Sequence, residues 1–296
     1  MSTLLPAVLP VGLIIFIGFI VGRTLSLQPQ TLSQLVLFVL SPALVIDSLY
    51  RTTLSVRNSI GLLTGFALTS LIIFCIVQLI SKIAHLSLST SRALTATAML
   101  PNNGNMGLPV VAFALGEAGL ERAIIYMVGS SILLFGFGPA IVQGKGIVQG
   151  LKLTLKLPLI WSISVGLTLR FSPIELPFSI DTAIQNLGKA AIPIALILLG
   201  IQLSTTKFQL RKKELSSLFI RLFIAPAIAY TVGSILNLEL LTLQVLVLQS
   251  AMPTAVNSLV LVGEFGGDKD LVARAIVTST LMSFISLPLV LFLLLG

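Results

Sequence analysis

The sequence predicts an all-α integral membrane protein whose ten transmembrane helices form two inverted five-helix repeats. The prediction rests on an apolar composition, on apolar windows long enough to cross a bilayer, and on prolines and polar residues that recur at a constant separation. Of the 296 residues, 56% are hydrophobic and only 9% are charged, and the mean hydropathy is +1.08. A soluble domain with this composition lacks the polar groups to cover its surface, so the expected surroundings are a lipid bilayer.

The apolar windows lie at residues 4–22, 31–50, 58–81, 92–116, 121–142, 157–170, 180–203, 215–236, 240–264 and 271–295. About 20 residues span the ~30 Å of hydrocarbon in a bilayer, and only the sixth window is clearly short. We expect the first window to be a retained span rather than a signal peptide. The expected domains are a first repeat at 1–142, a basic cytoplasmic connector at 143–156 and a second repeat at 157–296.

The distribution of basic residues predicts the orientation. Twelve of the 18 lysines and arginines fall in loops on one side of the predicted topology and four on the other. The more basic side is cytoplasmic by the positive-inside rule. We therefore expect a multi-pass protein of the plasma (inner) membrane with both termini on the non-cytoplasmic side. Lys189 and Arg221 lie inside spans, and for Arg221 we expect the side chain to snorkel to the cytoplasmic interface.

The two halves of the chain repeat one another. At a separation of 152 residues Pro101 matches Pro253, Asn105 matches Asn257, and an Arg-Ala-Ile triplet follows in both halves. An odd number of spans in each half makes the repeat inverted. Secondary transporters of this kind build their site from broken helices at the bilayer midplane. The alternative is a relic repeat without functional meaning.

Both matched prolines interrupt an apolar span. Proline lacks an amide donor and clashes with the preceding turn, so helices are expected to break near Pro101 and Pro253. In hydrocarbon such a break survives only inside protein or beside a water-filled cavity. We expect the breaks to be shaped by Pro101, Gly104, Gly107, Pro109 and Pro253, and the substrate to be bound by Asn102, Asn103, Asn105, Thr254 and Asn257.

The chemistry around the breaks favours an anion. Free amides and the positive end of a helix dipole bind anions. Between Arg92 and Glu117, and between Glu239 and Glu264, there is no ionisable side chain. An organic anion suits such a site better than a bare cation does. The alternative is a pair of proline kinks whose asparagines bind neighbouring helices.

Two ionisable residues inside spans are candidate coupling charges, Asp47 and Lys189. Intramembrane charges mark functional sites by default. Asp47 also precedes Arg51 by four residues and can pair with it at the interface, while Lys189 can snorkel outward. If the two candidates approach each other, they form a pair sensitive to protons or substrate, and coupling to H⁺ or Na⁺ stays open.

The composition argues against other classes. One cysteine and one histidine cannot supply a disulfide framework or a multi-ligand metal centre, so we expect no metal and no cofactor. The net charge of +8 is spread over short loops, which gives no nucleic-acid-binding face. An intramembrane enzyme needs a Ser–His pair, an aspartate pair or a zinc motif. The lone His85 and the lone in-span Asp47 supply none of these, so we expect no enzyme.

Three motifs resemble the auxin efflux carrier family. Leu100–Pro109 reads L-P-N-N-G-N-M-G-L-P and is similar to that family's fourth helix. A-M-P-T-A-V-N at Ala251–Asn257 and I-P-I-A-L-I-L-L-G at Ile192–Gly200 are similar to its ninth and seventh helices. The resemblance covers essentially the whole chain, but the long hydrophilic central loop of the plant members is absent here.

The resemblance implies a fold like that of bile-acid symporters, with broken helices 4 and 9 that cross. It implies a scaffold of helices 1, 2, 6 and 7, through which a homodimer would form, and a mobile transport domain of helices 3–5 and 8–10 that works as an elevator. It places Asn102 on the substrate carboxylate. The implied function is alternating-access transport of an auxin-like acid or a malate- or malonate-type anion. A cation/proton exchanger using Asp47 and a transporter-like membrane sensor remain alternatives.

Overall fold

The computed structural model describes residues 4–137, 154–172, 175–205 and 212–295, and every regular element in these ranges is a helix. Most of the predicted connector, residues 143–153, lies outside the described residues. The helices of the first half are α1 Leu4–Thr24, α2 Pro29–Leu35, η1 Val36–Leu40, α3 Ser41–Arg51, α4 Val56–Ile83, α5 Leu88–Met99, η2 Asn103–Gly107, α6 Leu108–Ser131 and η3 Ile132–Phe137. Those of the second half are α9 Pro158–Phe171, α10 Phe178–Thr205, α11 Lys212–Phe219, η4 Ile220–Ile224, α12 Ala225–Ile235, α13 Leu240–Ser250, α14 Asn257–Phe265 and α15 Lys269–Leu295.

The described helices follow the predicted apolar windows closely. Among the described residues, five helices are long and apolar enough to cross a membrane: Pro29–Arg51, Val56–Ile83, Phe178–Thr205, Glu214–Ile235 and Lys269–Leu295. The fourth window was predicted to end at Gly116, and this glycine has a φ of 67° that separates two helical parts of α6. Glycine adopts positive φ without the steric penalty that a Cβ causes, so it permits the turn there.

Wide π-helical turns precede three prolines. The turn η1 comes before Pro42, η2 before Pro109 and η4 before Pro226. A proline has no N–H to give to the carbonyl four residues earlier, and its ring crowds that carbonyl. A local π turn relieves the crowding while the helix continues, and such turns occur often at functional sites. All three turns contribute residues to the region described below.

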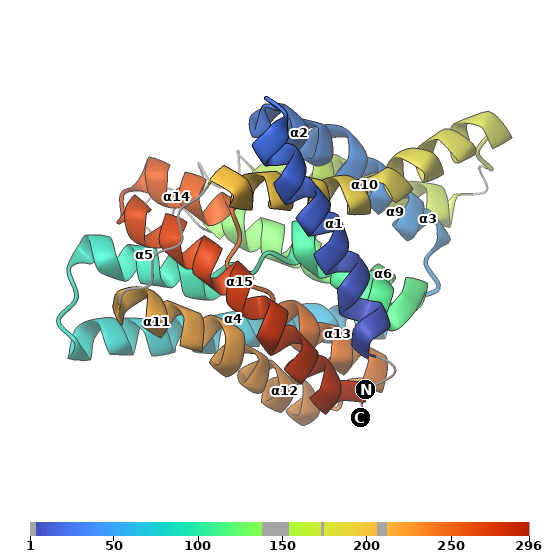
Figure 1. Cartoon of the computed structure of the whole chain (residues 1–296). Helices are drawn as coiled ribbons and strands as arrows, with labels where there is room; N and C mark the ends of the chain where they lie inside the picture. The colour runs from blue at the N-terminus through green and yellow to red at the C-terminus, as the bar shows by residue number, and fades with distance from the viewer. Residues whose placement is uncertain (1–3, 138–153, 173–174, 206–211, 296) are drawn as a thin grey trace.

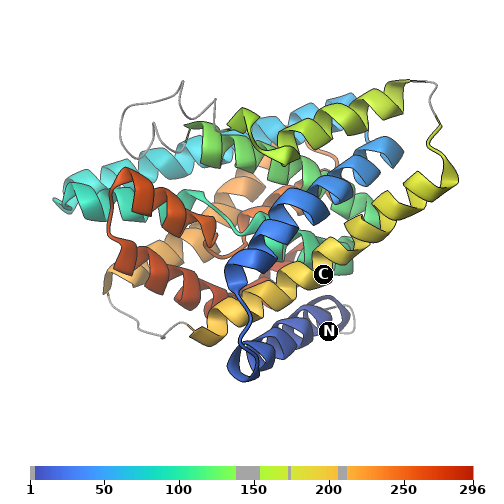
Figure 2. The same ribbon diagram turned by 90° about the horizontal axis from the view of Figure 1, so that it is seen from above.

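The helices pack in two groups. In the first, α1 runs along α10, and α3 packs on α9 and α10 (Figures 1 and 2). Gly200 of α10 permits the α1–α10 approach, because a Cβ there would clash with the backbone of Ile15 and Phe19. In the second group α4 packs on α5, α6 and α12, while α15 packs on α5 and α11. The start of α1 and the end of α15 lie at the same end of the molecule (Figure 1).

Candidate functional site

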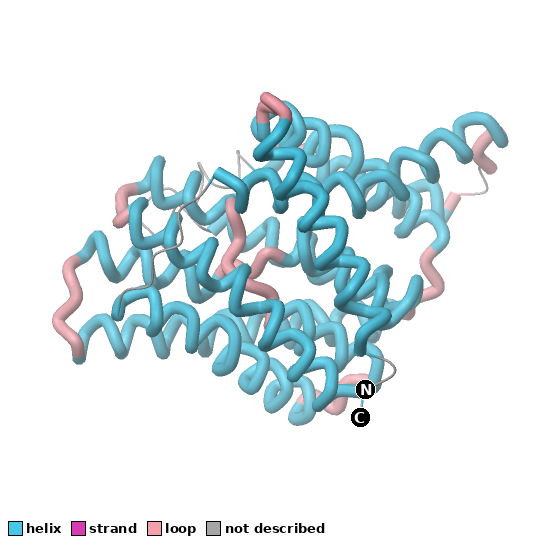
Figure 3. The backbone as a smooth tube through the Cα atoms, in the orientation of Figure 1, coloured by secondary structure: helices cyan, strands magenta, loops and turns pink. Residues whose placement is uncertain are grey.

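The two predicted breaks meet in the middle of the molecule. Figure 3 shows them as short loop segments inside the helical body, after α5 and after α13. They pair as a short antiparallel bridge between Pro101 and Thr254. The Asn102 amide donates to the Pro253 carbonyl at 2.7 Å, and the Ala255 amide donates to the Leu100 carbonyl at 2.8 Å. Each break therefore pairs backbone groups that the other leaves free, which offsets the free-energy cost of interrupting a helix inside the protein.

A cavity of about 100 Å³ lies against this bridge. A buried water needs roughly 10–15 Å³ by this measure, so the space holds several waters or a small ligand. It is lined by residues in and after the two breaks, together with residues in or next to α2, η1, α3, α6, η3, α9 and α10: Ser33, Val36, Leu37, Ser41, Leu100, Pro101, Asn102, Asn103, Gly104, Asn105, Met127, Ser130, Ser131, Leu134, Leu157, Leu159, Leu198, Ala255, Val256 and Asn257. The cavity therefore lies between the two groups of helices.

Two buried amide donors in this lining have no partner. Asn102 is 5% exposed and Asn103 is 7% exposed, and the Nδ2 atom of each makes no hydrogen bond within the described structure. A buried donor without a partner costs about 1–3 kcal/mol, so such groups usually meet a ligand or an ordered water. The N–H groups at the start of η2 also lack carbonyl partners within the helix. Unpartnered amide donors thus lie among the residues that line the cavity.

The other predicted substrate contacts divide between the cavity and the core. Asn105 and Asn257 line the cavity, and Asn257 is exposed. Thr254 is fully buried, its hydroxyl donates to the Thr97 carbonyl at 3.0 Å, and it is not in the cavity lining. The Thr254 amide donates to Ser279 Oγ at 3.1 Å. Thr254 therefore ties the second break to α5 and α15 in this structure.

The glycines and prolines of the first break have distinct surroundings. Gly104 lines the cavity, whereas a Cβ on Gly107 would clash with the side-chain amide of Gln249. Pro109 stands at the beginning of α6 and is buried. Gln249, in the last turn of α13, is 0% exposed, and neither atom of its amide has a partner in the described structure. The sequence interpretation did not select Gln249, although it is one of few amides in an apolar helix.

Arg221 also belongs to this region, and the expectation that it snorkels to the interface is wrong. Its side chain is 1% exposed. The Nη1 atom donates to the Ala98 carbonyl at 2.6 Å, and Nη2 donates to the Ser250 carbonyl. Ser250 Oγ also lies 3.1 Å from the hydroxyl of Tyr126. The sequence placed Arg221 about one turn inside a helix end, but the π turn η4 and the packing of α11 and η4 on α5 and α15 direct it inward.

The two candidate coupling charges lie apart from the cavity lining. Asp47 Oδ1 accepts from Arg51 Nε at 2.8 Å, and the same guanidinium binds Asp181 on α10. Lys189 is exposed and makes no ion pair with the described acidic residues. The hypothesised Asp47–Lys189 pair is therefore not formed in this structure. Asp47 instead forms the i,i+4 pair with Arg51 that the sequence offered as the alternative.

A larger cavity of about 450 Å³ continues from the first toward one end of the molecule. It shares Ser33, Val256 and Asn257 with the central cavity and is also lined by Pro29 and Thr205. Pro29 begins α2 and Thr205 ends α10. The central cavity is therefore bordered by open space on the side where these two helix ends lie.

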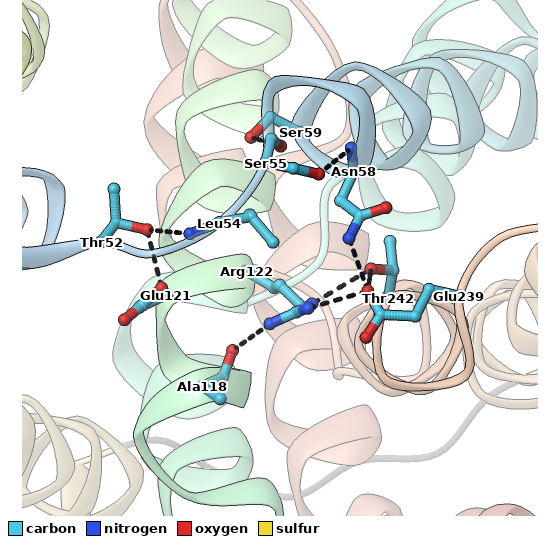
Figure 4. A network of polar contacts seen from close by, with 10 residues as sticks. All are labelled: Thr52, Leu54, Ser55, Asn58, Ser59, Ala118, Glu121, Arg122, Glu239 and Thr242. Carbon is cyan, nitrogen blue, oxygen red and sulfur yellow. Dashed lines mark hydrogen bonds and ion pairs between the residues drawn. The ribbon is translucent and has the colours of Figure 1, made fainter.

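At another place polar contacts connect the α3–α4 loop, α6 and α13 (Figure 4). Thr52, which follows α3, donates its hydroxyl to Glu121 of α6 at 2.7 Å. One helical position further, Arg122 donates to Glu239 at 2.9 Å and to Thr242 at 3.1 Å at the start of α13. These contacts connect the α3–α4 loop with α6 and α13.

Comparison with known proteins agrees with a transporter. The family described as membrane transport protein matches residues 3–146 and 147–291. A protein of Methanothermobacter thermautotrophicus named an uncharacterized transporter is 30% identical over 293 residues, covering 95% of both chains. An uncharacterized transporter of Methanocaldococcus jannaschii is 28% identical over 95% of this chain and 96% of its own. A protein of Rhizobium meliloti named "Putative malonate transporter" is 22% identical, over 96% of this chain and 93% of its own.

Proposed function

Because the chain belongs to the membrane transport protein family that includes the auxin efflux carriers, we propose that it is a secondary transporter of a small organic carboxylate. It is an integral membrane protein with several apolar helices long enough to cross a bilayer. The proposed substrate is a malonate- or malate-type anion or an auxin-like acid, and it binds in the cavity at the crossing of the two breaks. The name of the Rhizobium meliloti relative is consistent with this substrate class.

The observation that carries the proposal is the pair of orphaned amides. Asn102 and Asn103 belong to the lining of a cavity beside a helix N-terminus, their side-chain Nδ2 donors are buried without a partner, and no carboxylate is among the described lining residues. A carboxylate is an acceptor only and needs several donors to replace its lost hydration. The positive end of the helix dipole adds to the attraction. A cation or proton exchanger is less well supported, because this lining offers a cation no negative side chain.

The proposed mechanism is alternating access. The helices then count as ten spans in two inverted repeats, with both termini on the non-cytoplasmic side. Helices α1, α2–α3, α9 and α10 form the scaffold, and the scaffolds of two copies form a homodimer. The remaining helices carry the substrate as an elevator. On this topology the ends of α2 and α10 that border the larger cavity face the cytoplasm, so the structure corresponds to an inward-facing state.

Transport by purified protein in proteoliposomes tests the proposal. Uptake of labelled malonate, malate and indole-3-acetate is measured alongside malonamide, a neutral relative of malonate with amides in place of both carboxylates. We expect at least one carboxylate to be transported and malonamide to be rejected, because a neutral amide gains little from the donors and the dipole. Transport of malonamide at the same rate as malonate, or transport of a cation alone, would refute the proposal.

A further inference from the structure

One guanidinium joins the carbonyl ends of both broken helices. Arg221 donates from Nη1 to the carbonyl of Ala98 and from Nη2 to the carbonyl of Ser250. Ala98 lies in the last turn of α5 and Ser250 is the last residue of α13. Both residues precede their proline, whereas the orphaned asparagines follow it. The guanidinium therefore occupies the C-terminal ends of the crossing, and the candidate substrate donors belong to the opposite, N-terminal side.

The charges at this contact balance. A helix C-terminus carries roughly half a negative charge, so the two ends together present about one. Arg221 supplies one positive charge, that of its guanidinium group. The four ion pairs of the described residues do not include Arg221. An arginine that is 1% exposed and has no carboxylate partner is costly unless other negative groups compensate it. The two helix ends are that compensation.

Half-helix C-termini and unwound carbonyls are the places where broken-helix transporters hold a coupling cation. We propose that Arg221 is a built-in counter-cation, whose guanidinium fills the position of an inorganic cation at this crossing. Substrate binding at the N-terminal side then requires no Na⁺ or K⁺. This statement about substrate rests on the proposed function. The occupation of the two helix ends by the guanidinium does not.

The geometry of Arg221 fits the role of a counter-cation better than the role of a neutral hydrogen-bond donor that only links two helices. A guanidinium is a planar fork whose two Nη groups reach two acceptors at once, whereas a lysine is a point charge. The side chain projects from the π turn η4, which also orients it before Pro226. The Tyr126 and Ser250 hydroxyls, which hydrogen-bond each other, add polar groups without a carboxylate, and the Arg221 Nε atom has no partner in the described structure. If the link between the two helices needed no charge, the neutral side-chain amide of an asparagine or glutamine would suffice.

Thermal unfolding of the purified protein tests the counter-cation without any substrate. The melting temperature Tm of wild type, Arg221→Ala and Arg122→Ala is measured in sodium, potassium or choline chloride at equal ionic strength. It is also measured with guanidinium chloride added at a low, non-denaturing concentration. Arg122 is the matched control, because it is also buried but pairs with the carboxylate of Glu239. We expect the wild-type Tm to be the same in all three salts. We expect Arg221→Ala to lose Tm and to regain part of it with sodium or guanidinium, and Arg122→Ala to regain none.

A wild-type Tm that rises with sodium over choline, or an Arg221→Ala variant that no cation restores, would overturn the inference. If Arg221→Ala does not fold, the comparison of Arg221→Lys with Arg221→Gln tests the inference instead. Arg221→Lys retains a charge, so its Tm should lie between those of wild type and Arg221→Gln, whereas equal Tm values for the two variants contradict a counter-cation.

Malonate binding to wild type is then measured in sodium and in choline. Unchanged affinity is expected, and a tenfold loss in choline would also overturn the inference. Absence of malonate binding in both salts would count against the proposed substrate class only, because the Tm series stands by itself.

Discussion

Replacing Asn102 by alanine separates substrate binding from stability. The Asn102 Nδ2 group has no partner in the described structure, so its removal takes away no internal hydrogen bond. A bound carboxylate, in contrast, loses one charge-assisted bond of about 1.5–3 kcal/mol. Since 1.4 kcal/mol is a factor of ten, malonate affinity is expected to fall by roughly ten- to 150-fold. The Tm is expected to change little, because the side chain borders an existing cavity and the proline break remains.

Titration calorimetry on purified protein measures the affinity, and two further variants sharpen the result. Asn102→Asp retains the size but adds a negative charge, so it is expected to bind malonate more weakly than Asn102→Ala does. Thr254→Val is the control, because its hydroxyl donates to Thr97 and is absent from the cavity lining. It is expected to lower the Tm and leave the affinity unchanged. An Asn102→Asp variant that binds malonate as well as wild type would refute the reasoning.

Three more outcomes follow from the structure. Gly107→Ala forces a Cβ onto the Gln249 amide and is expected to cost roughly 1–3 kcal/mol of stability; an unchanged Tm in thermal denaturation would contradict the close contact. Thr52→Val removes the hydroxyl that donates to Glu121 and is expected to destabilise the conformation of this structure by about 1.5–3 kcal/mol. Cysteines placed in the cavity lining should then react faster with a maleimide added from the external side, and an unchanged labelling rate would contradict the prediction. A cysteine replacing His85, in a background without the native cysteine, is expected to react only from the cytoplasm; labelling of intact cells by an impermeant reagent would reverse the proposed topology.

Where the helices break could be predicted because the cause is local. Pro101 and Pro253 interrupt their helices through their own missing N–H group, which needs no knowledge of the neighbours. Gly116 likewise ended a predicted span where the backbone has a positive φ. Helix bounds and the position of the candidate site therefore follow from composition, length and the two prolines. The pairing of the breaks is different, because the bridge between Pro101 and Thr254 depends on the crossing itself.

The sequence did not predict all of the side chains that contact the two breaks where they cross. Arg221 is one turn inside a helix end by sequence, where snorkelling and inward burial have the same pattern, and only packing decides between them. Its acceptors are backbone carbonyls of Ala98 and Ser250, which no residue type encodes. For Thr254 the sequence offered a hydroxyl near the site, but the direction of that hydroxyl toward Thr97 is a tertiary property.

The central claim is that a carboxylate binds at the crossing of the two breaks. A crystal or electron cryo-microscopy structure of the protein with malonate tests it most directly. We expect ligand density in the cavity beside Pro101 and Thr254, with a carboxylate oxygen within about 3.2 Å of the Nδ2 atoms of Asn102 and Asn103, the usual N–H···O limit. Malonate bound elsewhere, or a cation in contact with these two amides, would contradict the account.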